Sequence, residues 1–103
     1  MPEPGFASLY DSTLLAIEDA VEALDADIDF ETVNQILTLA FPDESCIIIT
    51  PQSATGQLWV AARSGGFHFG HDGQSWKRTT DGKSLQVVLD ELFRDQGGVP
   101  LDF

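Results

Sequence analysis

The fold is decided by residues 45–70, which read SCIIITPQSATGQLWVAARSGGFHFG. Three runs of strand-forming residues, at 45–50, 57–62 and 66–70, are separated by short connections that contain Pro, Gly and Ser. Connections of this length join antiparallel neighbours, because a parallel crossover needs about a dozen residues or more. The stretch therefore predicts three consecutive antiparallel strands.

Further strands are predicted on both sides of this stretch. Residues 27–31 alternate between acidic and apolar side chains, which is typical of a half-buried strand. Asp is a poor strand former, so three outward acids in five residues favour an edge strand. Residues 35–41 and a short run at 74–78 complete a sheet of five to six strands.

Two amphipathic helices frame the strands. A helix is predicted over residues 7–26, where Tyr10, Leu14, Ile17, Val21 and Leu24 recur at helical spacing. A second helix follows Ser84, a plausible N-cap, and ends at Gly97-Gly98, with residues 99–103 packing back beside the helices. The order predicts a single α+β domain over residues 1–103. It is a two-layer α-β sandwich, with two helices packed on one face of a five- to six-stranded antiparallel sheet.

Alternation within the strands assigns side chains to the two faces of the sheet. The helix-facing set is predicted to be Leu37, Leu39, Phe41, Ile47, Ile49, Leu58, Val60, Phe67 and Phe69. The outward set is Ile36, Thr38, Ala40, Cys46, Ile48, Thr50, Gln57, Trp59, Ala61, Arg63 and His68. An outward Trp59 is a candidate contact residue, because Trp is enriched in interface hot spots. The alternative is a plain solvated face, since single exposed apolar residues need no function.

The charge is strongly acidic, with 17 acidic and five basic residues and a net charge of −12. No Lys or Arg occurs before Arg63. This balance argues against nucleic acid and anionic membranes as partners and favours cations or a basic protein surface. No run is apolar enough to span a membrane, and Cys46 is the single cysteine. We therefore expect no internal disulfide, no membrane span and a reducing, cytoplasmic setting.

Acidic residues of the first helix and the following strand form what we call the acidic ridge. Its members are Asp11, Glu18, Asp19, Glu22, Asp25, Asp27, Asp29 and Glu31. Carboxylate oxygens are hard ligands that suit iron, manganese, calcium or magnesium. Because the ridge contains no His or Cys, we expect weak, multiple and exchangeable metal sites that retain water. The alternative is a solvated acidic face that aids solubility.

No constellation in the sequence predicts catalysis. The Glu-x-x-His motif of di-iron helices is absent, and Gly65-Gly66 lacks the Lys and following helix of a phosphate loop. Cys46 lies in a strand with no neighbouring positive charge, which favours an inert thiol. We therefore expect a protein that is not an enzyme and that does not catalyse iron oxidation.

The central strands contain two distinctive strings, Gln57-Leu58-Trp59-Val60-Ala61 and Gly65-Gly66-Phe67-His68-Phe69, which are accompanied by Gln52, Trp76 and Ile17-Glu18-Asp19. Together they resemble the bacterial, CyaY-type branch of the frataxin family. The resemblance covers residues 10–97. It implies a frataxin-like sandwich and an iron-binding protein, with ferrous or ferric iron, that regulates iron–sulfur cluster assembly as iron donor or iron sensor.

The same resemblance implies partners and contact residues. The partners are a cysteine desulfurase of the IscS type and a scaffold of the IscU type, and the chain is expected to be a monomer without iron. The partner-binding set is Glu18, Glu22, Asp25, Gln57, Trp59, Arg63 and His68. Two alternatives stay open: an acidic interaction module with incidental metal binding, and an iron store or detoxifier that assembles into larger particles.

Overall fold

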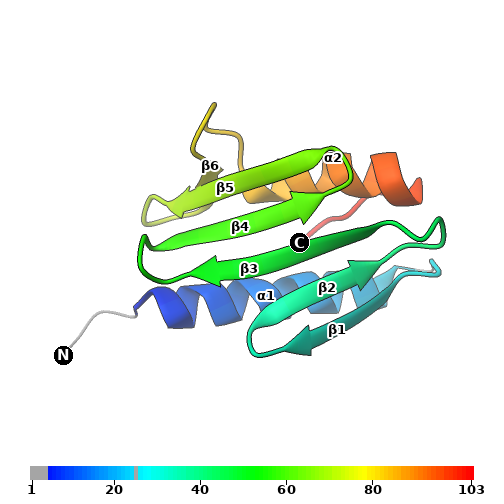
Figure 1. The fold of residues 1–103 in the computed structure, drawn as a ribbon, viewed down its shortest axis with the longest axis horizontal. Helices are drawn as coiled ribbons and strands as arrows, with labels where there is room; N and C mark the ends of the chain where they lie inside the picture. Colours follow the sequence, from blue (N-terminus) through cyan, green and yellow to red (C-terminus); the bar gives the residue numbers. More distant parts are fainter. Residues whose placement is uncertain (1–4, 25) are drawn as a thin grey trace.

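A computed structural model describes residues 5–24 and 26–103. The elements are α1 (Phe6–Ala23), β1 (Asp29–Val33), β2 (Ile36–Ala40), β3 (Cys46–Gln52), β4 (Gln57–Ala62), β5 (Gly65–His71), β6 (Trp76–Arg78) and α2 (Leu85–Gly97). Both helices lie against one face of the sheet (Figure 1). The predicted α+β sandwich of two helices on an antiparallel sheet is therefore confirmed.

The sheet is a simple meander in the order β1-β2-β3-β4-β5-β6, and every neighbouring pair is antiparallel. The β1–β2 hairpin turns through Asn34 and Gln35, whose φ angles of 52° and 68° are those of a tight two-residue turn. Because the strand order follows the chain, β1 and β6 form the two edges (Figure 1).

Two predicted boundaries were wrong near the first connection. The helix predicted to reach residue 26 ends at Ala23, because Leu24 adopts an extended backbone with φ −76° and ψ 135°. The strand predicted at residues 27–31 lies two residues later, at Asp29–Val33, because the tight turn pairs Val33 with Ile36. Ile28 nevertheless packs partly buried against the core, as its place in the alternation predicts.

The core lies between the helices and the sheet and matches the predicted helix-facing set with one exception. The buried side chains are Tyr10, Leu14, Ile17, Val21, Leu37, Leu39, Phe41, Ile47, Ile49, Leu58, Val60, Phe69, Trp76, Leu85, Val88, Leu89, Leu92, Phe93 and Leu101. Phe67 was predicted to be buried but is only half-buried. The guanidinium of Arg78 covers its ring at 5.2 Å from the centroid, so a cation takes the place of a helix there.

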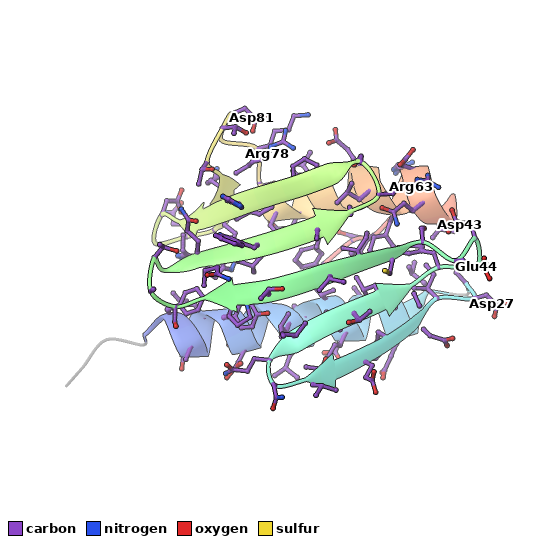
Figure 2. All side chains as sticks on the ribbon, in the orientation of Figure 1. Asp27, Asp43, Glu44, Arg63, Arg78 and Asp81 are labelled. Carbon is purple, nitrogen blue, oxygen red and sulfur yellow. The ribbon has the colours of Figure 1, made fainter. Side chains whose placement is uncertain are left out.

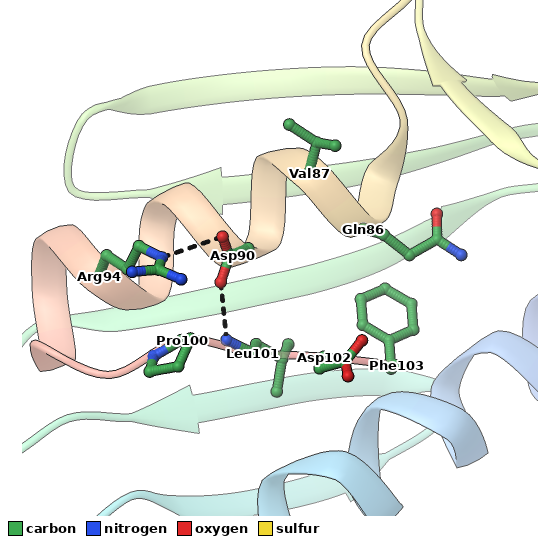
Figure 3. A pocket seen from close by; sticks show the side chains of 8 residues that line it. All are labelled: Gln86, Val87, Asp90, Arg94, Pro100, Leu101, Asp102 and Phe103. Atoms are coloured by element: carbon green, nitrogen blue, oxygen red, sulfur yellow. Dashed lines mark hydrogen bonds and ion pairs between the residues drawn. The ribbon is translucent and has the colours of Figure 1, made fainter.

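The C-terminal tail packs beside α2, as predicted. The Asp90 carboxylate accepts a hydrogen bond from the Leu101 amide at 3.0 Å and another from Arg94 Nε at 3.0 Å (Figure 3). Leu101 is buried, and Phe103 lines shallow pockets on this side of the molecule. In the part of the chain that the structure describes, neither helix has the length and apolar character needed to cross a membrane.

Candidate functional site

The helical part of the acidic ridge faces the free edge of the sheet. Tyr10, Leu14, Ile17 and Val21 point into the core. Asp11, Glu18 and Glu22 follow on one neighbouring flank because the helix turns about 100° per residue. The Thr32 hydroxyl of β1 donates a hydrogen bond to the Glu18 carboxylate. This contact shows that the flank lies beside the edge strand.

The strand part of the ridge continues around that edge. Asp29 and Glu31 are exposed on β1 and line a shallow pocket with Thr38 and Ala40, which are outward residues of β2. Asp27 precedes the strand, and Figure 2 shows it at the end of the sheet where Asp43 and Glu44 also lie. The carboxylates therefore surround one border of the molecule, from the side of the helix to the outer sheet face.

Two predicted ridge members, Asp19 and Asp25, are not placed on this border. Asp19 is exposed on α1, about 100° further round the helix than Glu18, so it points away from the border. Asp25, predicted to bind both metal and partner, lies outside the residues that the structure describes.

The basic residues do not neutralise the ridge. Arg63 pairs with Asp43 and Asp95, Arg78 with Asp81, Lys83 with Glu91 and Arg94 with Asp90. Over residues 5–24 and 26–103, no Lys or Arg nitrogen lies within 4.0 Å of a ridge carboxylate. Apart from half-buried Glu18, the described ridge acids are exposed. The border therefore has a concentrated negative charge that is open to solvent.

The ridge carboxylates are spread out rather than gathered into a cage. Among the described residues, no group of three or more His, Cys, Asp or Glu side chains is placed to hold a metal ion. A hard cation on this border would therefore be held by one or two carboxylates and complete its coordination with water. The donor set fits oxygen-preferring metals at scattered positions along the border.

This crowding leads to a prediction about ionic strength. Raising NaCl from about 10 to 150 mM is expected to raise the Tm by several degrees, because a shorter Debye length of about 8 Å screens repulsion between the exposed carboxylates. Differential scanning calorimetry measures the shift. The Glu22→Gln/Asp29→Asn variant should show a smaller dependence on salt than the wild type. A Tm that does not change with salt in the wild type would contradict the repulsion.

A second candidate surface lies on the outer face of the sheet, around Trp59. Its ring stacks on the cross-strand partner His68, with centroids 4.2 Å apart and an angle of 12° between the planes. Trp59 Nε1 donates a hydrogen bond to Gln57 Oε1 at 3.0 Å. The ring is half-buried by these contacts, while His68 is exposed. The prediction that Gln57, Trp59 and His68 share one outward patch is confirmed.

The placement of Arg63 in that patch was wrong. Strand β4 ends at Ala62, and Arg63 begins the turn to β5 at the far end of the strand from Gln57. Its guanidinium donates to Asp43 at 2.8 Å and to the Asp95 carbonyl and carboxylate at 2.9 and 3.2 Å. Its charge is thus directed to the β2–β3 turn and α2 rather than to Trp59 (Figure 2).

Gln96 is a positioning residue that the sequence pattern did not reveal. It is buried, accepts a hydrogen bond from the Arg63 amide at 3.1 Å, and donates to Ser45 Oγ at 2.9 Å. It thereby joins the end of α2 to the β2–β3 turn and the β4–β5 turn. Because its partners lie 33 and 51 residues away, no local spacing signals this role.

Comparison with known proteins gives consistent matches over nearly the whole chain. A family model described as a frataxin-like domain matches residues 1–99. The chain is 40% identical over 105 residues to a Bordetella parapertussis protein named iron–sulfur cluster assembly protein CyaY, covering 98% of this chain and 96% of that one. A Dechloromonas aromatica protein of the same name is 42% identical over 99 residues, covering 95% and 94%. The solved frataxin of Psychromonas ingrahamii superimposes with a TM-score of 0.89 at 27% identity, covering 94% and 92%.

Proposed function

The chain belongs to the frataxin-like family, and from this premise we propose that it is an iron-binding regulator of iron–sulfur cluster assembly that docks on a cysteine desulfurase. Relatives that are 40% and 42% identical over nearly their whole length are named iron–sulfur cluster assembly proteins, which supports a role in cluster assembly. The proposal places the chain in the bacterial cytoplasm. It assigns no chemical reaction to the chain itself.

The observation that carries the docking proposal is the acidic ridge without basic partners. A dense and exposed set of carboxylates beside a free sheet edge attracts an Arg- and Lys-rich surface over a distance of about one Debye length. On this proposal, Glu18 and Glu22 approach the desulfurase from the helix, and Asp29 and Glu31 approach it from the edge strand. Such steering acts mainly on the association rate and weakens as salt rises.

The metal that we propose for the ridge is iron, which is handled as cargo rather than as a resident cofactor. Scattered carboxylates with retained water suit several weak sites for ferrous or ferric iron, and they also accept other divalent cations. Weak sites release the ion readily, which a donor or a sensor requires.

The outer face of the sheet would contact a second partner. On this proposal the patch of Gln57, Trp59 and His68 contacts the IscU-type scaffold while the ridge faces the desulfurase.

A matched pair of variants tests the docking proposal. Glu22→Gln/Asp29→Asn removes two exposed ridge charges, and Glu91→Gln/Asp102→Asn removes two exposed charges elsewhere. At low salt we expect the ridge variant to bind the purified desulfurase at least about tenfold more weakly, a loss of about 1.4 kcal/mol, because steering charges are lost. The control variant should bind like the wild type in isothermal titration calorimetry. Equal losses in both variants would contradict a specific ridge.

Iron binding is tested separately by ¹H–¹⁵N NMR with ferrous iron under argon. Line broadening confined to residues 11–31 supports iron binding at the ridge. Uniform or absent broadening, together with intact binding to the desulfurase, favours an interaction module for which metal is incidental. Sedimentation with iron under air tests the remaining alternative, because an iron store would form larger particles.

A further inference from the structure

The outer face of the sheet is electrostatically divided. Strands β3, β4, β5 and β6 contain no Asp or Glu, although the chain carries a net charge of −12. Strand β1, at the opposite edge, places Asp29 and Glu31 on the same outer face. On the outward positions of β4 to β6, His68 and Lys77 are the ionisable side chains, and the neutral Gln57 and Trp59 lie beside them. The strands of this half therefore lack the carboxylates that dominate the rest of the molecule, and they carry the charge of Lys77.

Three hydrogen-bond donors surround one open position in this half. Gly70 pairs with Gln57 on β4 and with Lys77 on β6, and His68 lies two residues before it on β5. A Cβ added at Gly70 would meet nothing within 4 Å, so the space above it is free. Neighbouring strands are about 4.8 Å apart, which places Gln57 and Lys77 about 10 Å apart on either side of that space. A carboxylate fits between them.

Each of the three side chains has donor capacity left. The indole N–H of Trp59 can only donate, so the oxygen of Gln57 faces it and the amide NH₂ of Gln57 faces away. His68 stacks through its ring face on Trp59, which leaves its edge nitrogens exposed. Lys77 is exposed and has no ion-pair partner within 4.0 Å among residues 5–24 and 26–103. Asp72, in the adjacent turn, accepts hydrogen bonds from the amides of Ser75 and Gln74 at 2.9 Å, and these bonds first, and then the charge of Lys77, lower the pKa of its carboxyl group.

We propose that Gln57, His68 and Lys77 form a docking site for an acidic protein segment, which places an Asp or Glu carboxylate over Gly70 and an apolar side chain against Trp59. Charge complementarity supports this occupant, because a basic segment would be drawn to the ridge at the other edge instead. The inference deepens the proposed function, since it rests on the sheet face being a contact surface. It states the chemistry of the partner there, which is opposite in sign to that of the ridge's partner.

The test uses the full chain and a capped hexapeptide in which two Glu are flanked by Leu, followed by ¹H–¹⁵N NMR at 20 mM NaCl. We expect shifts of the Trp59 indole and of His68, Gly70 and Lys77. Lys77→Glu should weaken binding at least about tenfold, which is the size of effect expected when a like charge replaces the partner of a carboxylate. The control Lys83→Glu changes the net charge equally, but the Lys83 ammonium is directed to Glu91 of α2 at 3.3 Å, on the other side of the sheet from Trp59, so binding should be unchanged.

Three results would overturn the inference. They are no shifts at the site, equal binding of a peptide with Gln in place of Glu, and equal weakening by Lys77→Glu and Lys83→Glu. If Lys77→Glu disturbs the fold, as its spectrum would reveal, Lys77→Met serves instead and should weaken binding by a smaller factor. The Glu22→Gln/Asp29→Asn variant should keep its affinity for the acidic peptide while losing affinity for the desulfurase. Failure of one surface is thereby separated from failure of the other.

Discussion

Replacing Phe93 with Ala is expected to lower the free energy of unfolding by about 3–5 kcal/mol, the usual cost of removing a fully buried aromatic ring. Phe93 is completely buried on α2, and its ring meets that of Phe41 edge to face at a centroid distance of 5.1 Å. The substitution removes both the apolar contacts and this aromatic pair. For a domain of this size, each kcal/mol corresponds to about 4–8 °C, so the Tm should fall by at least about 12 °C.

Urea denaturation followed by tryptophan fluorescence measures this loss. Val87→Ala is the matched control, because Val87 lies on the same helix and is 48% exposed. The control should change stability by no more than about 0.5 kcal/mol, as expected for a surface substitution. Similar losses in the two variants would mean that α2 does not pack on the sheet through the face that contains Phe93.

The fold could be predicted largely because strand alternation, turn length and helical spacing all favour the same architecture. The outward and inward residues of the strands alternate without interruption from residue 36 to 41 and from 57 to 60, so one assignment of faces places nearly all of them. Short turns then require antiparallel neighbours. The helix faces followed from the spacing of Tyr10, Leu14, Ile17 and Val21, all of which are buried.

The errors occur where long-range contacts decide the outcome. Phe67 has the apolar character of a core residue, but a guanidinium from β6 covers it instead of a helix. Arg63 continues the outward alternation of β4 in the sequence. In the structure the strand has already ended, and carboxylates 20 and 32 residues away bind its side chain. No local pattern contains this information.

The candidate site was predictable in composition but not in arrangement. Helical spacing placed Asp11, Glu18 and Glu22 on one flank, yet it did not show which sheet edge the flank would face. The hydrogen bond from Thr32 to Glu18 identifies this edge, because it joins the helix flank to β1. Lys77 was missed as a site residue for a different reason. Its importance depends on the absence of acids from four strands rather than on any motif that contains it.

The Tyr10 hydroxyl joins α1 to two parts of the sheet, the β1–β2 turn and strand β3. It donates to the Gln35 carbonyl in the β1–β2 turn at 2.6 Å, and the Ile49 carbonyl of β3 lies 3.1 Å from the same oxygen. The ring is fully buried. Burial first, and then the negative charge of neighbouring Asp11, raises the pKa of Tyr10 far above its usual value.

This shift predicts a loss of stability in alkali. Above pH 10, the usual pKa of tyrosine, the hydroxyl ionises in the unfolded chain but stays protonated in the folded one, so the folded state binds more protons. The Tyr10 contribution to the free energy of unfolding is complete below about pH 10. It should then fall by up to about 1.4 kcal/mol for each further pH unit. Because Tyr10 is the single tyrosine of the chain, tyrosinate absorbance reports this group alone.

Tyr10→Phe separates the ionisation from the rest of the alkaline titration. The variant should be less stable by about 1–3 kcal/mol at neutral pH, because the Gln35 carbonyl loses its hydrogen-bond donor and the buried Ile49 carbonyl loses its polar neighbour. Its stability should depend less on pH above about pH 10, because no phenol remains to ionise. In the wild type, tyrosinate absorbance should rise together with the loss of secondary structure in circular dichroism. A tyrosinate signal at about pH 10 in the folded protein would show that the hydroxyl reaches solvent, and that α1 is not held against the β1–β2 turn in the way that positions the acidic ridge.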